Sequence, residues 1–344
     1  MSCPSVTVNI AVYNERDDIA RCLSSIYTQE YPKDKLEVIV VDGGSNDGTL
    51  EAAKCYPTKI IHNPRRTGPA GRTLGFLHAK GDLHMYLDAD MELCGRDWLK
   101  KMVKPLKDRE DVVASFPKYI VDKRDPPLNR YFSYHEAQLN PMLEFLSPSI
   151  SSTITEQLTD YYLCKFKTGT IPFMPINLFR MSVLQDILRS KQEDWEWIDP
   201  EVPLLAVDKG YDRFAYVPVG VYHHTYLNLK VYATKVRRDF CRTFVPTLGK
   251  RRVNRSTTYV DIRSPMSILK FGAWVLYVNM VFPELIRGIV SSLYKKDWVF
   301  LYRPVIALIY TDLPIFISIA TQPGRYAIRY LIGEIARSLK THQT

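Results

Sequence analysis

The first hundred residues alternate apolar runs of strand length with segments of helical spacing, and this alternation limits the folds that the chain can adopt. The apolar runs are Leu36–Val41 and Leu83–Leu87, Val6–Val12 is a β-branched run, and Lys59–His62 is a further short strand. The segments of helical spacing are Asp17–Gln29, Thr49–Cys55, Pro69–Ala79 and Asp97–Lys107. Strands and helices that alternate in this way predict a doubly wound, parallel α/β sheet. Because the runs are continuously apolar, we expect both faces of the sheet to be covered.

The next hundred residues continue this pattern less regularly. Val112–Ile120 and Tyr211–Val221 have the composition of strands, whereas Phe179–Arg189 and Val202–Lys209 have helical spacing. Residues 121–170 are rich in Pro, Ser and Tyr and show no clear period. We therefore predict an irregular region between the fifth strand and the last helices of this domain.

Charge and cysteine usage restrict the partners and the compartment. Lys and Arg number 46 against 37 Asp and Glu, which gives a net charge of +9 and favours anionic partners such as phosphates or anionic lipid. No nucleic-acid-binding motif is present, so no nucleic-acid partner is predicted. The six cysteines are far apart and include no C-x-x-C pair, which indicates reduced thiols rather than a zinc site. The N-terminus runs directly into a strand without a basic and apolar leader, so no secretory signal is expected.

The chain changes character after the last predicted strand. Residues 230–255 hold nine Lys or Arg against one acid, and two apolar stretches follow, Ile268–Val290 and Trp298–Ala320. Each stretch is long enough to span a bilayer, but charged residues and prolines interrupt both. Charges near a bilayer centre are costly, so re-entrant or interfacial helices and a helical core subdomain are the alternatives. We predict an α/β domain over residues 1–228, followed over 229–344 by a basic linker and a hydrophobic helical region associated with the membrane.

Polar motifs follow the first three predicted strands. The first is Tyr13-Asn14-Glu15-Arg16, the second is V-V-D-G-G-S-N-D-G-T over residues 40–49, and the third is the Gly-rich segment 68–75. In open α/β sheets the carboxyl ends of the strands form the edge that binds ligands. Asp42 can accept hydrogen bonds from a base or a ribose, and the planar fork of Arg72 can pair with a diphosphate. Taken singly, the first motif fits a loop with a helix cap equally well, and Arg72 fits a solvated helix face.

The fourth strand ends in Tyr86-Leu-Asp-Ala-Asp-Met91, which places Asp88 and Asp90 at the same edge. Two carboxylates separated by one small residue suit a divalent cation that is held against phosphates. Such triplets are common in loops, and it is the three preceding motifs that give this one its weight.

The order of these motifs resembles family 2 glycosyltransferases with the GT-A fold, a Rossmann-like doubly wound mixed sheet, over about residues 5–225. The resemblance implies a nucleotide-sugar donor such as a UDP- or GDP-sugar, a Mg²⁺ or Mn²⁺ cofactor, and inversion at the anomeric carbon. Residues 1–228 would then be the catalytic domain, and the irregular region would lie on the acceptor side.

The resemblance also assigns roles by position. Tyr13, Glu15 and Asp42 would hold the base and ribose. Asp88 would touch the ribose or the metal, and Asp90 would ligate the metal. Arg72 would bind the diphosphate, although Thr73 stands where many relatives have Asn and weakens any role assigned to that turn.

The general base is assigned by its distance from Gly210-Tyr211. In similar enzymes an acidic pair lies about a dozen residues before such a dipeptide, and here that position holds Ile198-Asp199. Asp199 is therefore the predicted base, although Ile198 replaces the usual first acid. The pair Glu193-Asp194 is the rival, and an acidic helix start is the structural alternative.

A histidine at the end of the catalytic region is the last predicted site residue. In similar enzymes a His at the position of Tyr222-His223-His224-Thr225 reaches the metal or the diphosphate. We predict His224 as the metal ligand, with His223 as the alternative. An exposed His pair at a strand end is the reading without a functional role.

These assignments predict an enzyme that adds a sugar to a hydroxyl of a lipid-linked or polysaccharide acceptor at the cytoplasmic face of the cell membrane. An acceptor that is polyprenyl phosphate itself is the alternative, and such an anion would need no base. The Asp42-Gly43-Gly44 form of the second motif favours the first version. A non-catalytic nucleotide-sugar-binding protein is disfavoured by the intact Asp88 and Asp90. A nucleotidyltransferase is disfavoured because no Gly-rich basic loop follows the first strand.

Overall fold

The computed structural model divides the chain into two compact units. It describes residues 3–134, 141–167, 171–172, 174, 176–188, 197, 201–225, 228–241, 245, 256–257, 260–261 and 265–341. One unit, here called the sheet unit, comprises Met1–Val121, Ile150–Thr168 and Phe173–His224. The other, here called the helical unit, comprises Asp122–Ser149, Gly169–Pro172 and Thr225–Thr344. The functional division into a catalytic region 1–228 and a membrane-associated region 229–344 stays a prediction.

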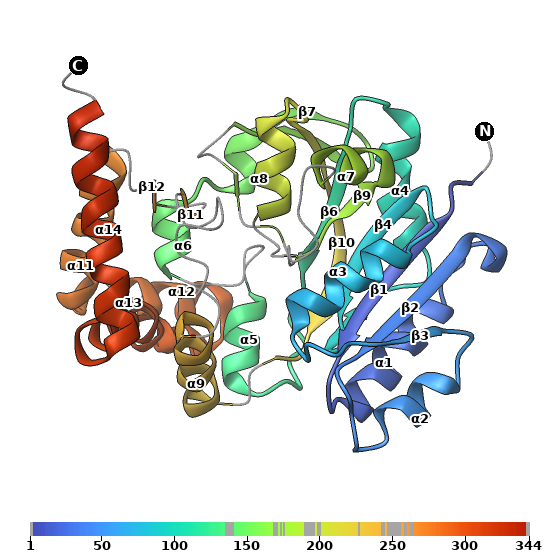
Figure 1. The fold of residues 1–344 in the computed structure, drawn as a ribbon, viewed down its shortest axis with the longest axis horizontal. Helices are drawn as coiled ribbons and strands as arrows, with labels where there is room; N and C mark the ends of the chain where they lie inside the picture. The colour runs from blue at the N-terminus through green and yellow to red at the C-terminus, as the bar shows by residue number, and fades with distance from the viewer. Residues whose placement is uncertain are drawn as a thin grey trace. The chain divides into compact units, whose positions relative to one another are not determined.

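The sheet unit is built on a ten-stranded mixed sheet in the order β3-β2-β1-β4-β9-β6-β10-β8-β7, with β5 paired to β10 (Figure 1). The strands are β1 (Val6–Val12), β2 (Leu36–Asp42), β3 (Lys59–His62), β4 (Leu83–Asp88), β5 (Met91–Leu93), β6 (Ala114–Tyr119), β7 (Ile154–Gln157), β8 (Tyr162–Lys165), β9 (Leu178–Arg180) and β10 (Arg213–His223). The first four pair in parallel, and β9, β5, β8 and β7 join the sheet antiparallel. The α/β class and the first four strands are therefore confirmed.

Helices connect these strands. They are α1 (Arg16–Tyr27), η1 (Lys33–Lys35), α2 (Thr49–Lys54), α3 (Gly68–His78), α4 (Trp98–Asp108), η2 (Ile150–Thr153), α7 (Met181–Leu188) and α8 (Glu201–Asp208). The interior strand β1 shows why the apolar runs become strands, since Val6, Val8 and Ile10 are fully buried. Burial of such side chains contributes about 1.5–3 kcal/mol each, which drives the helices onto the sheet.

Two predictions about the later part of this region are wrong. The segment predicted as a helix from Phe179 begins instead as strand β9, and the helix α7 starts only at Met181. Residues 121–170, predicted to be irregular, contain α5 (Pro127–Ser133), α6 (Pro141–Leu146), β7 and β8. Both short strands, β7 and β8, have four residues, which is too few for a two-residue period to stand out in the sequence.

Helix α3 lies close against β1 and β2 because it presents glycines to the sheet (Figure 1). A Cβ atom on Gly71 would lie 2.8 Å from the Cβ of Ala11, and one on Gly75 would lie 1.9 Å from Oδ1 of Asn9. The Nδ2 of Asn9 in turn donates a 2.7 Å hydrogen bond to the carbonyl of Arg72. The glycines of the third motif thus bring the backbone of α3, and Arg72 with it, onto the sheet.

The helical unit collects the remaining elements. They are α5 (Pro127–Ser133), α6 (Pro141–Leu146), α9 (Leu229–Asp239), β11 (Ser256–Thr257), β12 (Val260–Asp261), α11 (Pro265–Asn279), α12 (Phe282–Lys295), η5 (Trp298–Tyr302), α13 (Arg303–Ala320) and α14 (Gln322–Thr341). Its core includes Tyr131, Phe132, Val299, Phe300 and Ile306, from α5, η5 and α13. Apolar contacts between segments distant in sequence therefore hold this unit together.

Among the described residues, one helical segment is long and apolar enough to cross a membrane. It is Trp298–Ala320, of which a third is buried inside the protein. The pair Met266–Asn279 and Phe282–Lys295 meets the same criterion only when taken together, and its two helices are bent by 75°. Core helices of soluble proteins share this length and composition, so the orientation of side chains has to decide what these helices face.

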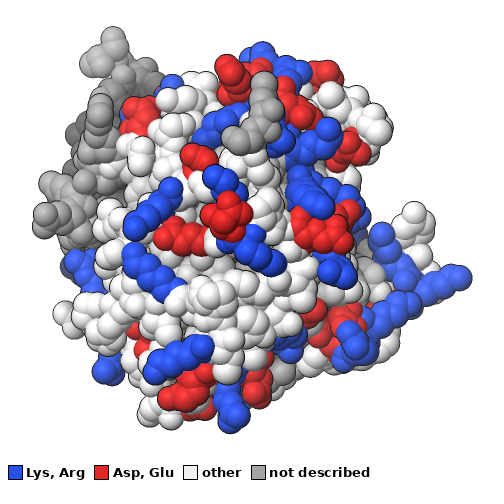
Figure 2. Space-filling model, turned by 90° about the vertical axis from the view of Figure 1, so that its right-hand side faces the viewer, with Lys and Arg blue, Asp and Glu red and all other residues white. Residues whose placement is uncertain are grey.

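Charges of both signs are mixed on the face of the protein in Figure 2. Lys and Arg side chains lie among Asp and Glu side chains there, and the described residues of this face form no continuous basic surface (Figure 2). Exposed ion pairs such as Lys104–Asp108, at 3.1 Å, are typical of the sheet unit. The net positive charge is therefore locally compensated on this face.

We expect Gly75→Ala to lower the free energy of unfolding by about 2 kcal/mol, because overpacking a close contact typically costs about 1–3 kcal/mol. Thermal or urea denaturation would measure the loss. Gly68→Ala is the matched control in the same helix, since no atom lies within 4 Å of a Cβ built there. Equal stability of the two variants would contradict the close approach of α3 to Asn9.

Candidate functional site

Three of the four motifs meet at one edge of the sheet. In the register of the strands, Val12 lies beside Asp42 and Ala11 lies beside Asp88. The loops that follow β1, β2 and β4 therefore emerge next to one another, at the carboxyl ends of parallel strands. The sequence prediction that these motifs share one edge is confirmed by this register.

The loop after β2 is organised by Asp42. Its carboxylate accepts hydrogen bonds from the backbone N–H groups of Gly44, at 2.8 Å, and Ser45, at 3.1 and 3.2 Å, and from the Ser45 hydroxyl at 2.6 Å. Asp42 is only 3% exposed. The structure therefore shows Asp42 ordering its own loop, and contact with a base or ribose remains a proposal for this side chain.

Asn14 ties the loop after β1 to the loop after β2. Its backbone N–H donates to the Ser45 hydroxyl at 2.9 Å, and its side-chain oxygen accepts from the Asn46 N–H at 2.9 Å. Asn14 adopts a left-handed conformation, with φ 55°, which Asn tolerates better than most residues. Next to it the ring of Tyr13 is half exposed, and the backbone N–H of Glu15 donates to the Thr49 hydroxyl at 2.9 Å. Tyr13 is thus available to stack on a flat ligand group.

Arg72 reaches the fourth motif from helix α3. A terminal nitrogen of its guanidinium lies 2.8 Å from Oδ1 of Asp88, and the guanidinium carbon lies 4.7 Å from the centre of the Tyr86 ring. The ion pair and the aromatic ring hold the planar group in one place. Arg72 therefore brings a fixed positive charge to the edge where the carboxylates lie.

A cluster of possible metal ligands forms around the fourth motif. One ligand atom each from Asp88, Asp90 and His223 lies within 4.8 Å of the others. Oδ1 of Asp90 is buried and accepts no well-aligned hydrogen bond in the described part of the chain, and Nε2 of His223 lies 3.3 Å from it. Two carboxylates and an imidazole match the donor preferences of Mn²⁺, and Mg²⁺ accepts the carboxylates. A divalent cation would satisfy the buried Asp90 oxygen, so these three residues fit such an ion.

Strand β5 brings His223 to this cluster. It follows Asp90 directly and pairs antiparallel with the end of β10, so that His223 lies opposite Met91. The backbone N–H of His224 donates to the Asp90 carbonyl at 2.9 Å. Helix α1 holds β5 from the other side, because the Ser25 hydroxyl accepts from the Leu93 N–H at 3.1 Å. The metal-ligand geometry therefore depends on a short strand that sequence analysis missed.

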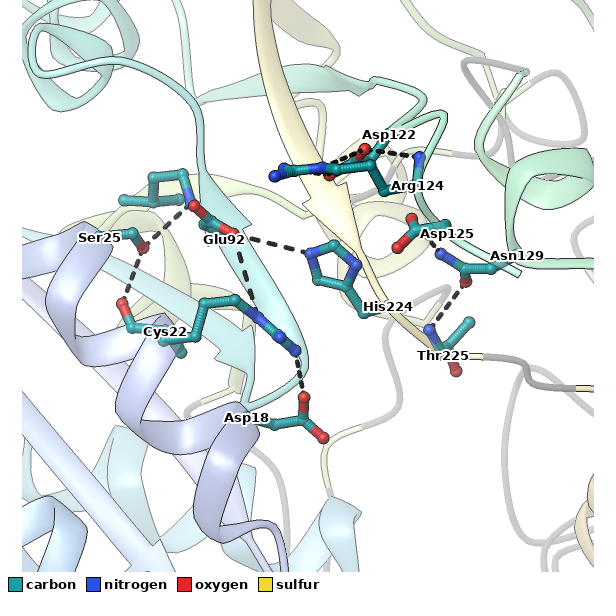
Figure 3. Close-up of polar contacts among 12 residues, drawn as sticks. Asp18, Cys22, Ser25, Glu92, Asp122, Arg124, Asp125, Asn129, His224 and Thr225 are labelled. Atoms are coloured by element: carbon teal, nitrogen blue, oxygen red, sulfur yellow. Dashed lines mark hydrogen bonds and ion pairs between the residues drawn. The ribbon is translucent and has the colours of Figure 1, made fainter. Parts of the chain in front are cut away.

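His224 points to a different set of side chains. Its Nε2 lies 3.7 Å from a carboxylate oxygen of Glu92, and Figure 3 shows the two side chains directed at each other. Glu92 also lies 4.0 Å from Arg21, which pairs with Asp18. The geometry favours His223 over the predicted His224 as a metal ligand. His224 is the first residue after β10, and its imidazole is directed at Glu92 rather than at the two aspartates.

The electrostatics of this edge favour a cation. Burial raises the pKa of the Asp18 carboxyl above its ordinary value, Arg21 opposes the shift, and the charge of Asp90 adds to it. Asp18 thus feels the negative charge that gathers around the fourth motif. A divalent cation bound between Asp88 and Asp90 would relieve this repulsion.

Trp197 is a buried anchor that sequence analysis did not identify. Its backbone N–H donates to the Thr73 hydroxyl at 2.8 Å, and its ring lies 5.8 Å from that of Phe76 and 5.5 Å from that of His84. Burial lowers the pKa of His84 to about 3, so its ring is neutral and packs as an apolar group. Thr73, the residue that departs from the family pattern, is thus a direct partner of this segment.

The structure does not describe the predicted general base. Asp199, Ile198 and the rival pair Glu193-Asp194 lie outside the described residues. Trp197 stands two residues before Asp199, is 2% exposed and is itself held on the sheet unit through Thr73.

The chain is similar to a known protein family and to several curated proteins. The model of the family described as "Glycosyl transferase family 2" matches residues 7–186, more than half of the chain. "Glycosyltransferase AglE" of Haloferax volcanii is 32% identical over 145 residues, which cover 40% of this chain and 47% of that protein. The "Poly(ribitol-phosphate) beta-glucosyltransferase" of Bacillus spizizenii is 33% identical over 92 residues, which cover 25% of this chain and 14% of that protein. The chain thus spans less than half the length of these curated relatives.

A solved structure supports the fold. The "Mannosyltransferase PcManGT from Pyrobaculum calidifontis in complex with GDP-Man and Mn2+" aligns with a TM-score of 0.50 over 90% of this chain and 86% of that chain. Its sequence identity is 20%, so the likeness bears on the fold alone. It agrees with the mixed sheet described above and with the GT-A fold that the motifs predict.

The geometry gives a direct test of the two histidines. We expect His223→Ala to weaken Mn²⁺ binding at least about tenfold, because one ligand atom is lost. His224→Ala is the matched control and should leave Mn²⁺ affinity close to that of the wild type. Electron paramagnetic resonance of free Mn²⁺, in the presence of UDP or GDP, would measure both. The reverse order of the two variants would restore His224 as the ligand.

Proposed function

Because the chain belongs to glycosyl transferase family 2, we propose that it transfers a sugar from a nucleoside-diphosphate donor to an acceptor hydroxyl, with inversion at the anomeric carbon. The observation that carries this proposal is the cluster of Asp88, Asp90 and His223 beside the fixed charge of Arg72. Carboxylates, imidazole and guanidinium together suit a metal-bound diphosphate better than any neutral ligand.

The proposed cofactor is Mg²⁺ or Mn²⁺, held by Asp88, Asp90 and His223. When bound, the ion supplies electrostatic stabilisation to the departing nucleoside diphosphate. Arg72 would add a second positive charge to the same leaving group, and its pairing with Asp88 holds it ready at that position. Tyr13, Glu15 and Asp42 would bind the base and ribose.

Asp199 would act as the general base. It would take the proton from the acceptor hydroxyl as the oxygen attacks the anomeric carbon on the face opposite the diphosphate, which inverts the configuration. The position of Trp197 supports this role, since this residue stands two before Asp199 and its backbone bonds to Thr73 of the helix that carries Arg72.

The proposed acceptor is a lipid-linked or polysaccharide glycan at the cytoplasmic face of the cell membrane. Two observations support a glycan acceptor and contact with a membrane. A relative is named a poly(ribitol-phosphate) beta-glucosyltransferase, and the described part of the helical unit contains an apolar helical segment of membrane-spanning length. Residues 1–228 would then form the catalytic domain, and residues 229–344 would associate with the membrane.

A panel of UDP-, GDP- and dTDP-sugars with Mn²⁺ would test the donor class. Ligands that bind only the native state raise its melting temperature, so we expect one nucleotide class to stabilise the protein. The same panel with Asp90→Asn should show little or no stabilisation, since the metal site is damaged. Failure of every activated sugar to shift the wild-type melting temperature would contradict the proposed function.

Asp199→Asn separates the two possible acceptors. With a hydroxyl acceptor, we expect donor affinity within about twofold of the wild type and transfer lower by about a hundredfold or more, the usual contribution of a general base. Asp194→Asn changes the rival pair and should retain transfer. Retained transfer in both variants would favour a phosphate acceptor, which needs no base. An equal loss of donor affinity, measured by calorimetry, would remove Asp199 from the role of base.

A further inference from the structure

Helix α12 has its apolar side outside and its polar side inside. Six large side chains along it are between 44% and 80% exposed: Phe282, Ile286, Ile289, Val290, Leu293 and Tyr294. They recur at spacings of three and four, so they form one stripe. The buried side of the same helix carries Glu284, which is fully buried, and Gly288. A helix on the surface of a water-soluble domain has the opposite arrangement.

Ion pairs hold the polar side of α12 in place. Glu284 accepts from Nε of Arg303 at 2.7 Å, from Arg287 at 3.1 Å and from the Tyr277 hydroxyl at 2.9 Å. Glu144 accepts from Arg287 and Arg303, both at 2.8 Å. Removing one partner of such a buried pair leaves an uncompensated buried charge, which is strongly destabilising. The helix therefore cannot rotate to bury its apolar stripe without losing these bonds.

The close packing of α12 fixes its orientation further. A Cβ atom on Gly288 would lie 2.6 Å from the carbonyl oxygen of Phe300 in η5, so the two backbones touch. No larger side chain fits at position 288 without a shift of the backbone. The exposed stripe is thus a built feature of the helical unit rather than the result of a loosely packed helix.

The length of α12 excludes a span by this helix alone. Its 14 residues extend about 21 Å, less than the hydrocarbon core of a bilayer, which is about 30 Å thick. Helix α11, which precedes it, is bent away by 75°. A short helix with one apolar side is typical of the interfacial plane.

The residues at the C-terminal end of the stripe match the head-group region of an anionic bilayer. Tyr294 is 80% exposed and Trp298 is 53% exposed, and both residue types concentrate at membrane interfaces. Lys295 and Lys296 lie between them, and the Lys295 ammonium is 5.4 Å from the centre of the Tyr294 ring. Two positive charges beside an apolar stripe complement lipid phosphates.

We infer that helix α12 lies in the plane of a bilayer that contains anionic lipid, with its apolar stripe in the acyl region and Lys295 and Lys296 at the lipid phosphates. This anchoring deepens the proposed function by giving the lipid-facing surface of the protein. The inference rests on that function only in taking the acceptor to be lipid-linked. The anchoring itself is tested independently, because vesicle binding is measured without donor or acceptor.

Flotation of the full chain with phosphatidylcholine vesicles, with and without phosphatidylglycerol, tests the inference. We expect wild-type protein to bind, and more tightly when phosphatidylglycerol is present. Ile289→Ser combined with Leu293→Ser should weaken binding at least about tenfold, because two apolar side chains leave the acyl region. Lys295→Gln combined with Lys296→Gln should remove most of the gain from phosphatidylglycerol. Leu77→Ser is the matched control, because this leucine is 67% exposed on α3 in the sheet unit.

Circular dichroism and thermal melting would establish that each variant is folded. Binding of the Ile289/Leu293 variant equal to that of the wild type overturns the inference. The inference is also overturned if the wild type does not bind vesicles and is a dimer by light scattering, while the Ile289/Leu293 variant is a monomer. The stripe would then contact a second copy of the chain. Vesicle binding without any donor-dependent melting shift supports the inference and contradicts the proposed function. A donor-dependent melting shift without vesicle binding supports the proposed function and contradicts the inference.

Discussion

The antiparallel pairing of β5 with the end of β10 is the interaction on which the candidate site depends. It places His223 opposite Met91, one residue beyond Asp90, although the two segments are far apart in the chain. Without it, Asp88 and Asp90 would form a common acidic triplet with no third ligand. The neighbouring strands β2, β1 and β4 bring the first, second and fourth motifs to the same edge, and within the described residues the β5–β10 pairing adds the third donor of a set that fits a divalent cation.

Buried charges have different surroundings in the two units. At the edge of the sheet unit, carboxylates are left close together with a buried Asp90 oxygen that no well-aligned hydrogen bond satisfies in the described residues. In the helical unit, Glu284 and Arg303 are both buried and fully engaged in hydrogen bonds with their neighbours. The first arrangement favours an added cation, whereas the second fixes a helix with its apolar side outward.

Much of the fold and of the site could be predicted because the first ninety residues carry local signals. Apolar runs and glycine-rich turns predicted strands β1 to β4, and the position of Asp88 and Asp90 followed from the strand that precedes them. The choice of His223 could not be predicted, since it depends on which strand pairs with Met91–Leu93, and such long-range pairing leaves no mark in a three-residue strand. The partner of Thr73 was missed for the same reason, because Trp197 is more than a hundred residues away.

Anomalous X-ray diffraction from crystals grown with Mn²⁺ and a nucleoside diphosphate tests the central claim most directly. The account predicts one strong manganese peak bonded to carboxylate oxygens of Asp88 and Asp90 and to the ring of His223, with the diphosphate between the ion and Arg72. The account would be contradicted by a manganese ion bound elsewhere, with these three side chains bonded only to water and to one another.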